Sequence, residues 1–194
     1  MNTLIGLMTS GTVIAIIVMV VLVLLVAYII ITYNNLVKNR NLVNEAFSTM
    51  DIYLKKRWDL VPNLVEVVKG YAKHESETFE KIVSLRGNSY NSMSNEEKLE
   101  TNNKLTDGIA KIMAVSENYP ELKANNSFIQ LNNELSKIET DIANSRKYYN
   151  GTVREYNNKI QKIPSNIVAA IFGFKSTKMI EIDNSERDNV RVNL

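Results

Sequence analysis

The residues with the clearest potential for chemistry are Lys73, His74 and Glu75, which stand together in the chain. A helical zinc protease needs a second histidine four residues after the first, so that both imidazoles share one helix face. Position 78 is Thr, and the chain has one histidine. A di-metal site in a helical bundle needs Glu-x-x-His pairs, and position 71 is Tyr. We therefore predict no enzymatic activity, no catalytic residue, no metal site and no cofactor.

A structural role fits the same residues better. Glu75 falls in the apolar row of a predicted helix, and a buried carboxylate needs a partner. Arg57 and Arg146 fall near the corresponding rows of other predicted helices and are suitable partners. The pattern predicts a core polar network of Arg57, His74, Glu75 and Arg146 that fixes the register of the helices. The alternative is a ligand- or ion-sensing site, or a pH switch, around His74 and Glu75.

Composition excludes several classes of function. The chain contains no cysteine, so disulfides, thiolate metal sites and a cysteine nucleophile are excluded. The net charge is +2, from 23 basic and 21 acidic residues. Proteins that bind nucleic acid usually carry a concentrated basic stripe, and this mixed distribution predicts no nucleic-acid partner.

One uninterrupted apolar stretch near the N-terminus is expected to place the rest of the chain relative to a membrane. Val13 to Ile31 is a run of 19 residues without charge, Pro or Gly. As a helix it covers roughly 28 Å, and the hydrocarbon core of a bilayer is roughly 30 Å thick. The alternatives are a buried core helix and a cleaved signal peptide, but the basic start and small-x-small cleavage site of a signal peptide are missing. We predict a transmembrane helix over residues 13–32, after a short tail of residues 1–12.

The flanking charges predict the orientation of this helix. No Lys or Arg precedes Val13, whereas Lys38 and Arg40 follow the stretch closely. Basic residues beside a span favour the cytoplasmic side. We therefore expect a single-pass protein of the cell (plasma) membrane, with its N-terminus outside and its body in the cytoplasm.

Four helical patterns follow the apolar stretch. The first runs on from the membrane without a Pro or Gly, with apolar residues recurring at helical spacing from Leu36 to Val61. Pro62 then interrupts the pattern, with Asp59 as a fair N-cap residue. We predict a turn at residues 59–62, and the alternative is a kink in one long helix. A second helix follows to about Leu85, and a third runs from a cap at Ser94 to about Asn118, ahead of Pro120.

The fourth helix has the clearest periodicity. It begins at Asn126 or Ser127 and ends at Pro164. Its main apolar row is spaced by seven, at Phe128, Leu135, Ile142, Tyr149, Tyr156 and Ile163. Short connections place successive helices side by side in opposite directions. The predicted fold is therefore all-α: an N-terminal transmembrane helix continuing into an antiparallel up-and-down four-helix bundle over residues 33–163.

Residues 164–194 form a separate region after the bundle. Its first part, Ile167 to Phe174, is apolar and uncharged and lies at the membrane end of an up-and-down bundle. We predict that Ile167, Ile171, Phe172 and Phe174 contact the membrane surface, as interfacial segments do. The alternative is that the segment folds back and caps the core. The remainder is a polar tail.

Three further side chains have predicted structural roles. Asn150 and Asn157 each follow a tyrosine and lie seven residues apart on one helix face. Asn in a helix seam specifies register, so we predict hydrogen bonds between helices, with a partner-binding stripe as the alternative. Trp58, the only tryptophan, is predicted to pack in the core.

Four stretches that cover most of the chain match a known family: YNNLVKNRNLVNEAF from Tyr33, DIYLKKRWDLVPNLVEVVKGYAKHE from Asp51, NYPELKANNSFIQLNNEL from Asn118 and SRKYYNGTVREYNNKIQKIPSNIVAAIFGF from Ser145. On these stretches, the chain resembles the LemA family of bacterial membrane proteins. The resemblance implies one N-terminal membrane helix and an antiparallel four-helix bundle, and it brings no activity or cofactor with it. Met179-Ile180-Glu181 departs from the family, which tends to have an aromatic pair before Glu.

The expected function is that of a membrane-anchored, non-enzymatic scaffold or interaction protein. The family resemblance implies a role in organising membranes or the cell envelope. The expected partners are the lipid bilayer and other membrane or envelope proteins. The alternative is the ligand- or ion-sensing bundle around His74 and Glu75.

Overall fold

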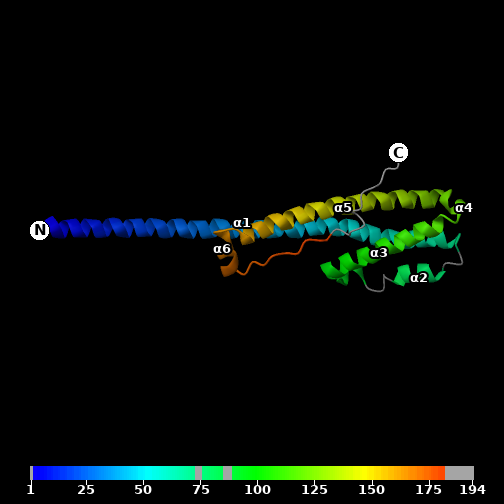
Figure 1. Ribbon diagram of the computed structural model, residues 1–194, viewed down its shortest axis with the longest axis horizontal. Helices are drawn as coiled ribbons and strands as arrows, with labels where there is room; N and C mark the ends of the chain where they lie inside the picture. Colours follow the sequence, from blue (N-terminus) through cyan, green and yellow to red (C-terminus); the bar gives the residue numbers. More distant parts are fainter. Residues whose placement is uncertain (1, 73–75, 85–88, 182–194) are drawn as a thin grey trace, which may run out of the picture. The chain divides into compact units, whose positions relative to one another are not determined.

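The computed structural model describes residues 2–72, 76–84 and 89–181, without the side chains of residues 2–10 and 76–78 (Figure 1). All regular elements within these residues are helical, which confirms the all-α prediction. They are α1 (Asn2–Lys69), α2 (Ser76–Ser84), the 3-10 turn η2 (Tyr90–Ser92), α3 (Asn95–Ser116), α4 (Pro120–Lys123), α5 (Asn126–Gln161) and α6 (Ser165–Ile171).

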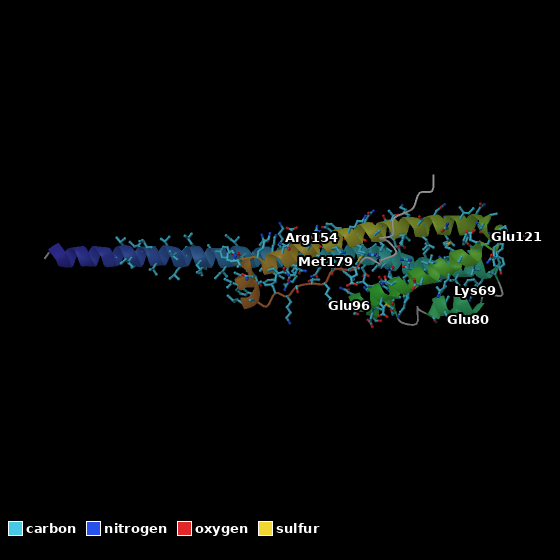
Figure 2. The ribbon with its side chains drawn as sticks, in the orientation of Figure 1. Lys69, Glu80, Glu96, Glu121, Arg154 and Met179 are labelled. Atoms are coloured by element: carbon cyan, nitrogen blue, oxygen red, sulfur yellow. The ribbon has the colours of Figure 1, made fainter. Side chains whose placement is uncertain are left out.

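The apolar stretch forms the exposed first part of α1. Of the side chains from Val13 to Ile31, only that of Ile29 is partly covered, and the sticks in Figure 2 project on all sides of the helix. Ile14 is 61% exposed and Leu24 is 63% exposed. Leaving so much apolar surface in water is unfavourable, and length and composition qualify the stretch as a candidate membrane span. The predicted continuity with the first bundle helix is confirmed, because α1 runs unbroken from Asn2 to Lys69.

The predicted turn at residues 59–62 is wrong. Pro62 lies inside α1, and the chain reverses only after Lys69. A proline inside a helix costs roughly 3 kcal/mol, but Val61, Leu64 and Val65 beside it are all at least 98% buried. Burying each such side chain stabilises by about 1.5–3 kcal/mol, which outweighs the proline. Leu64 therefore belongs to α1 rather than to a second helix.

The chain divides into two compact units: unit 1 is Met1–Glu45 with Asn150–Leu194, and unit 2 is Ala46–Tyr149. In unit 2, α1 and α5 run antiparallel, because Phe47 meets Tyr149 at one end and Tyr71, just past α1, meets Asn125 at the other. Trp58 is buried, as predicted.

Helix α3 runs parallel to α1 within unit 2. Asp51 pairs with Lys98, and six residues further along α1, Arg57 bonds Asn102. A capping box starts α3: the Ser94 hydroxyl accepts from the Glu97 N–H, and the Glu97 carboxylate accepts from the Ser94 N–H, as the cap predicted from the sequence requires. Helices α1 and α3 point in one direction and α5 points in the other, as the first, third and fourth helices of an up-and-down bundle do. The complete four-helix bundle stays a prediction.

Unit 1 packs a short helix and an extended segment against α1 and α5. Lys159 of α5 bonds Asn35 of α1, and Tyr33 of α1 contacts Phe172, directly after α6. The chain then extends along α5, and we call residues 175–181 the strap; Figure 2 labels Met179 on the strap and Arg154 on α5. Ile163, predicted as the last core residue of the fourth helix, is 83% exposed, because α5 ends at Gln161.

Candidate functional site

The end of unit 1 that follows the apolar stretch carries a short helix, α6, with apolar side chains on its buried face and on its exposed face. Its inward side chains, Val168 and Ala169, are buried. The outward side chains are large and apolar: Ile167 is 57% exposed, Ile171 is 68% exposed, and Phe172, directly after α6, is 50% exposed. Both alternatives for this segment therefore find support in the structure. One face covers a core, and the other presents apolar groups outward, where contact with a membrane surface stays a prediction.

Phe174 behaves differently from the other three predicted contact residues. Gly173 adopts a φ of 70°, which glycine tolerates without strain, and the chain turns there out of α6. Phe174 is consequently directed inward, with its ring 5.7 Å from Tyr33 and below the Arg40 guanidinium at 5.3 Å. It anchors α6 against α1 instead of pointing outward with Phe172.

The described part of unit 1 carries more basic than acidic residues. Its described residues, 2–45 and 150–181, contain seven Lys or Arg and three Asp or Glu. No acidic residue occurs between Glu155 and Glu181, while four lysines do: Lys159, Lys162, Lys175 and Lys178. An apolar segment with lysines before and after it in the chain fits the pattern of segments that lie on anionic membrane surfaces.

Two asparagines hold the strap on α5. The Asn150 carboxamide donates to the Ile180 carbonyl at 2.8 Å and accepts from the Ile180 N–H at 2.9 Å. Asn157 does the same for Thr177, at 2.8 and 3.0 Å. Seven helical residues rise about 10.5 Å, and three extended residues reach about 10 Å, so the two spacings match. We call this pair of contacts the asparagine clasp.

The prediction that these asparagines bond between helices is wrong. Their partner is an extended segment, and both of its bonded backbone groups come from the same residue each time. The two asparagines of the clasp therefore bond to backbone groups of the strap and not to its side chains. The departure of Met179-Ile180-Glu181 from the family pattern therefore leaves this contact intact.

Unit 2 contains a buried arginine, as the predicted polar network requires. Arg57 is 2% exposed; its Nη1 lies 3.1 Å from Asn102 Oδ1 and 3.0 Å from Glu139 Oε2. Burial lowers the pKa of Arg57, Glu139 raises that pKa, and nearby Arg146 lowers it. The network joins α1, α3 and α5, and its carboxylate partner in the described part of the chain is Glu139.

His74 and Glu75 lie outside the described residues, so the predicted contribution of these two residues stays a prediction. Within residues 2–72, 76–84 and 89–181, no group of three or more His, Asp or Glu side chains is placed to hold a metal ion.

A second polar cluster in unit 2 was not predicted from the sequence. The Tyr90 hydroxyl donates to Asp51 Oδ1 at 2.6 Å, and Lys98 Nζ lies 2.7 Å from Asp51 Oδ2. Lys98 also lies 4.9 Å from the Tyr90 ring centroid, and Trp58 packs on that ring at 5.5 Å. Burial, reinforced by the bond to Asp51, raises the pKa of Tyr90 well above its ordinary value. The hydroxyl therefore stays protonated, and the cluster ties the η2 turn to α1 and α3.

The sequence is similar to those of known proteins. The chain is similar to protein LemA of Metamycoplasma hominis, with 26% identity over 165 residues that cover 80% of this chain and 75% of that protein. It is also similar to the magnetosome proteins MamQ 1 and MamQ 2 of Paramagnetospirillum magneticum, with 33% identity over 73 residues. Those residues cover 38% of this chain and 27% of each MamQ protein. The model of the LemA family matches residues 46–194, most of the chain, and this protein belongs to the LemA family.

Proposed function

We propose that this protein is a non-enzymatic scaffold or interaction protein, anchored in the bacterial cell membrane by α1, with its helical body on the cytoplasmic side. The exposed apolar stretch from Val13 to Ile31 carries this proposal, because it continues without a break into the packed part of the same helix. Family membership and this candidate span are consistent with a membrane-associated protein. The partial similarity to two proteins named for the magnetosome supports a role in organising membranes or the envelope.

The scaffold role is tested by photo-crosslinking in native membranes. A photoreactive residue at exposed positions of unit 2, such as Ile52 or Ile129, is irradiated in cells, and the adducts are purified and identified. We expect a defined membrane or envelope protein to be captured repeatedly at one face. Absence of any adduct above background, together with thermal stabilisation by a small ligand, would favour the sensing alternative instead.

The proposal includes membrane-surface contact by α6 through Ile167, Ile171 and Phe172. These side chains, the surrounding lysines and the contact of Phe172 with Tyr33, two residues past the apolar stretch, support it. A lipid surface would cover apolar area that is otherwise left in water, at about 25 cal/mol per Å².

Quenching by brominated lipid tests this contact. Trp58 is buried in unit 2 and gives a constant background, so a Phe172→Trp variant in proteoliposomes adds one reporter. We expect brominated phospholipid to quench the added fluorescence. An Ile52→Trp variant is the matched control, because Ile52, at 57%, is about as exposed as Phe172, at 50%, but belongs to unit 2. Equal, weak quenching of both variants would refute the contact.

A further inference from the structure

A small pocket lies in unit 1 where the apolar stretch ends. Its volume is 220 Å³, and the side chains that line it come from α1, α5 and the start of α6. Ile31, the last residue of the apolar stretch, forms part of its wall. Since Ile31 closes the predicted span, the pocket would lie at the level of the lipid headgroups. The lining residues are Ile31, Thr32, Asn35, Leu36, Lys159 and Ser165.

The lining combines two apolar side chains of α1, Ile31 and Leu36, with polar side chains from all three helices. Lys159 supplies the charge: its Nζ donates to Asn35 Oδ1 at 2.9 Å and lies 3.3 Å from Glu155 Oε1. An ammonium has three N–H donors, so these two contacts leave one for a further acceptor. Asn35 in turn accepts from Asn39 at 2.8 Å, which holds its carboxamide in place. The lysine is therefore positioned by neighbours on both sides.

The size and surroundings of the pocket favour a lipid over a soluble ligand. Sites for drug-sized molecules usually measure about 300–1,000 Å³, whereas this one has room for a headgroup whose acyl chains remain outside. The exposed side chains of Ile31 and Ile167 offer apolar surface for those chains. Lys162, in the connection between α5 and α6, adds positive charge to this part of the chain. Basic pockets beside membrane helices are known to take anionic headgroups.

We propose that this pocket binds the phosphodiester headgroup of an anionic phospholipid, with Lys159 as the charged donor. The inference rests on the proposed membrane anchoring and adds a lipid partner of stated charge. Binding would fix one lipid where α1, α5 and α6 meet, and would make occupancy depend on the anionic lipid content of the membrane.

Native mass spectrometry of the full-length protein tests the proposal. The protein is released from detergent micelles containing equal amounts of dioleoyl-phosphatidylglycerol and dioleoyl-phosphatidylcholine. We expect the wild type to retain one phosphatidylglycerol in preference to phosphatidylcholine. Lys159→Gln should reduce that retention about tenfold, which corresponds to the loss of one charged hydrogen bond, and Lys159→Arg should preserve most of it.

Lys104→Gln is the matched control. Lys104, in unit 2, also pairs with a glutamate four residues earlier on its helix, as Lys159 does. It should retain lipid as the wild type does. Equal retention of both lipids by the wild type, or equal loss in both Gln variants, would overturn the proposal. Displacement of phosphatidylglycerol by millimolar glycerol 3-phosphate would also overturn it, because the site would then serve a soluble anion.

Failure of this proposal is distinguishable from failure of membrane anchoring. Alkaline carbonate extraction of cell membranes reports anchoring alone. Wild type that resists extraction but shows no lipid preference would remove the headgroup site and leave the anchor. Wild type that is extracted would remove the anchoring proposal and, with it, the basis for a lipid in this pocket.

Discussion

Arg57 is a buried cation whose partners come from two other helices. Its guanidinium bonds Asn102 and Glu139, and the like charge of nearby Arg146 repels it. A buried ion pair adds little net stability, but removal of one partner leaves an uncompensated charge. The arginine thus specifies how α1, α3 and α5 align in unit 2 more than it strengthens them.

We expect Glu139→Ala to lower the free energy of unfolding by about 2–3 kcal/mol, somewhat less than for a fully buried pair because Glu139 is 45% exposed. Adding Arg57→Met to that variant should restore part of the loss, since the uncompensated charge is then gone. Chemical unfolding followed by circular dichroism measures both. If the double variant is less stable than Glu139→Ala by the full cost of Arg57→Met alone, the charge argument fails.

Tyr90 gives a pH dependence with a defined sign. Its pKa is raised above the ordinary value of 10.0 by burial and by Asp51, so the folded protein holds this proton more tightly than the unfolded chain. The resulting stability is fully present below about pH 10 and is lost as the pH rises toward the higher folded value.

Tyr90→Phe should therefore reduce the loss of stability as the pH rises from about 9.5 to about 12. The midpoint of urea unfolding at each pH is the measurement. Tyr148→Phe, at a side chain that is 51% exposed in the same unit, is the control and should leave the pH dependence unchanged. An unchanged profile in Tyr90→Phe would contradict the role given to Tyr90.

At the scale of elements, two glycines in helices illustrate opposite constraints. A Cβ on Gly151 of α5 would meet nothing within 4 Å, whereas one on Gly108 of α3 would lie 3.0 Å from Ile82 of α2. Gly108 is thus the residue that lets α2 approach α3. Gly151 has no such neighbour and only weakens its helix.

Gly151→Ala should raise the free energy of unfolding by about 0.5–1 kcal/mol, the usual gain from Gly to Ala inside a helix. Gly108→Ala should show no such gain, and Gly108→Val should cost about 1–3 kcal/mol through overpacking. Thermal unfolding in detergent ranks the three variants. Equal effects of alanine at both positions would show that the α2–α3 approach is not tight.

The asparagine clasp predicts local protection of the strap. Each carboxamide occupies the N–H and C=O of one strap residue, Ile180 or Thr177. Asn157→Ala should therefore accelerate amide hydrogen exchange at Thr177 on the order of tenfold, as expected for loss of hydrogen bonds worth about 1 kcal/mol or more. Asn158→Ala, at an exposed neighbouring position, should leave this amide unchanged. Equal exchange in both variants would exclude the clasp as the source of protection.

At the scale of the whole molecule, the proposed cytoplasmic location of the helical body depends on the orientation of α1 in the membrane. Lys38 and Arg40 follow the apolar stretch and nothing basic precedes it, which favours the body on the inside. Since the chain lacks cysteine, single cysteines report sidedness cleanly. A membrane-impermeant maleimide should label Thr3→Cys in intact cells and label Asn63→Cys only after lysis. The reverse pattern would invert the topology.

Several features of this protein could be predicted from the sequence because they depend only on residues close together in the chain. The apolar stretch, the helical class, the cap at Ser94 and the core row from Leu36 to Leu54 follow from periodicity and composition within one element. The same periodicity placed Arg57 near an apolar row, as a possible member of a core polar network. Such features need only the neighbours along the helix, which the sequence itself supplies.

Tertiary structure decided the features that depend on residues far apart in the chain. Pro62 remains helical because the core on both sides of it is buried, and the proline alone could not reveal that. Asn150 and Asn157 bond strap residues that lie 30 and 20 positions further along the chain, instead of another helix. The hydrogen bond of Tyr90 to Asp51 spans 39 positions. Their partners are chosen by the three-dimensional path of the chain, since a polar side chain bonds whichever group packing brings within reach.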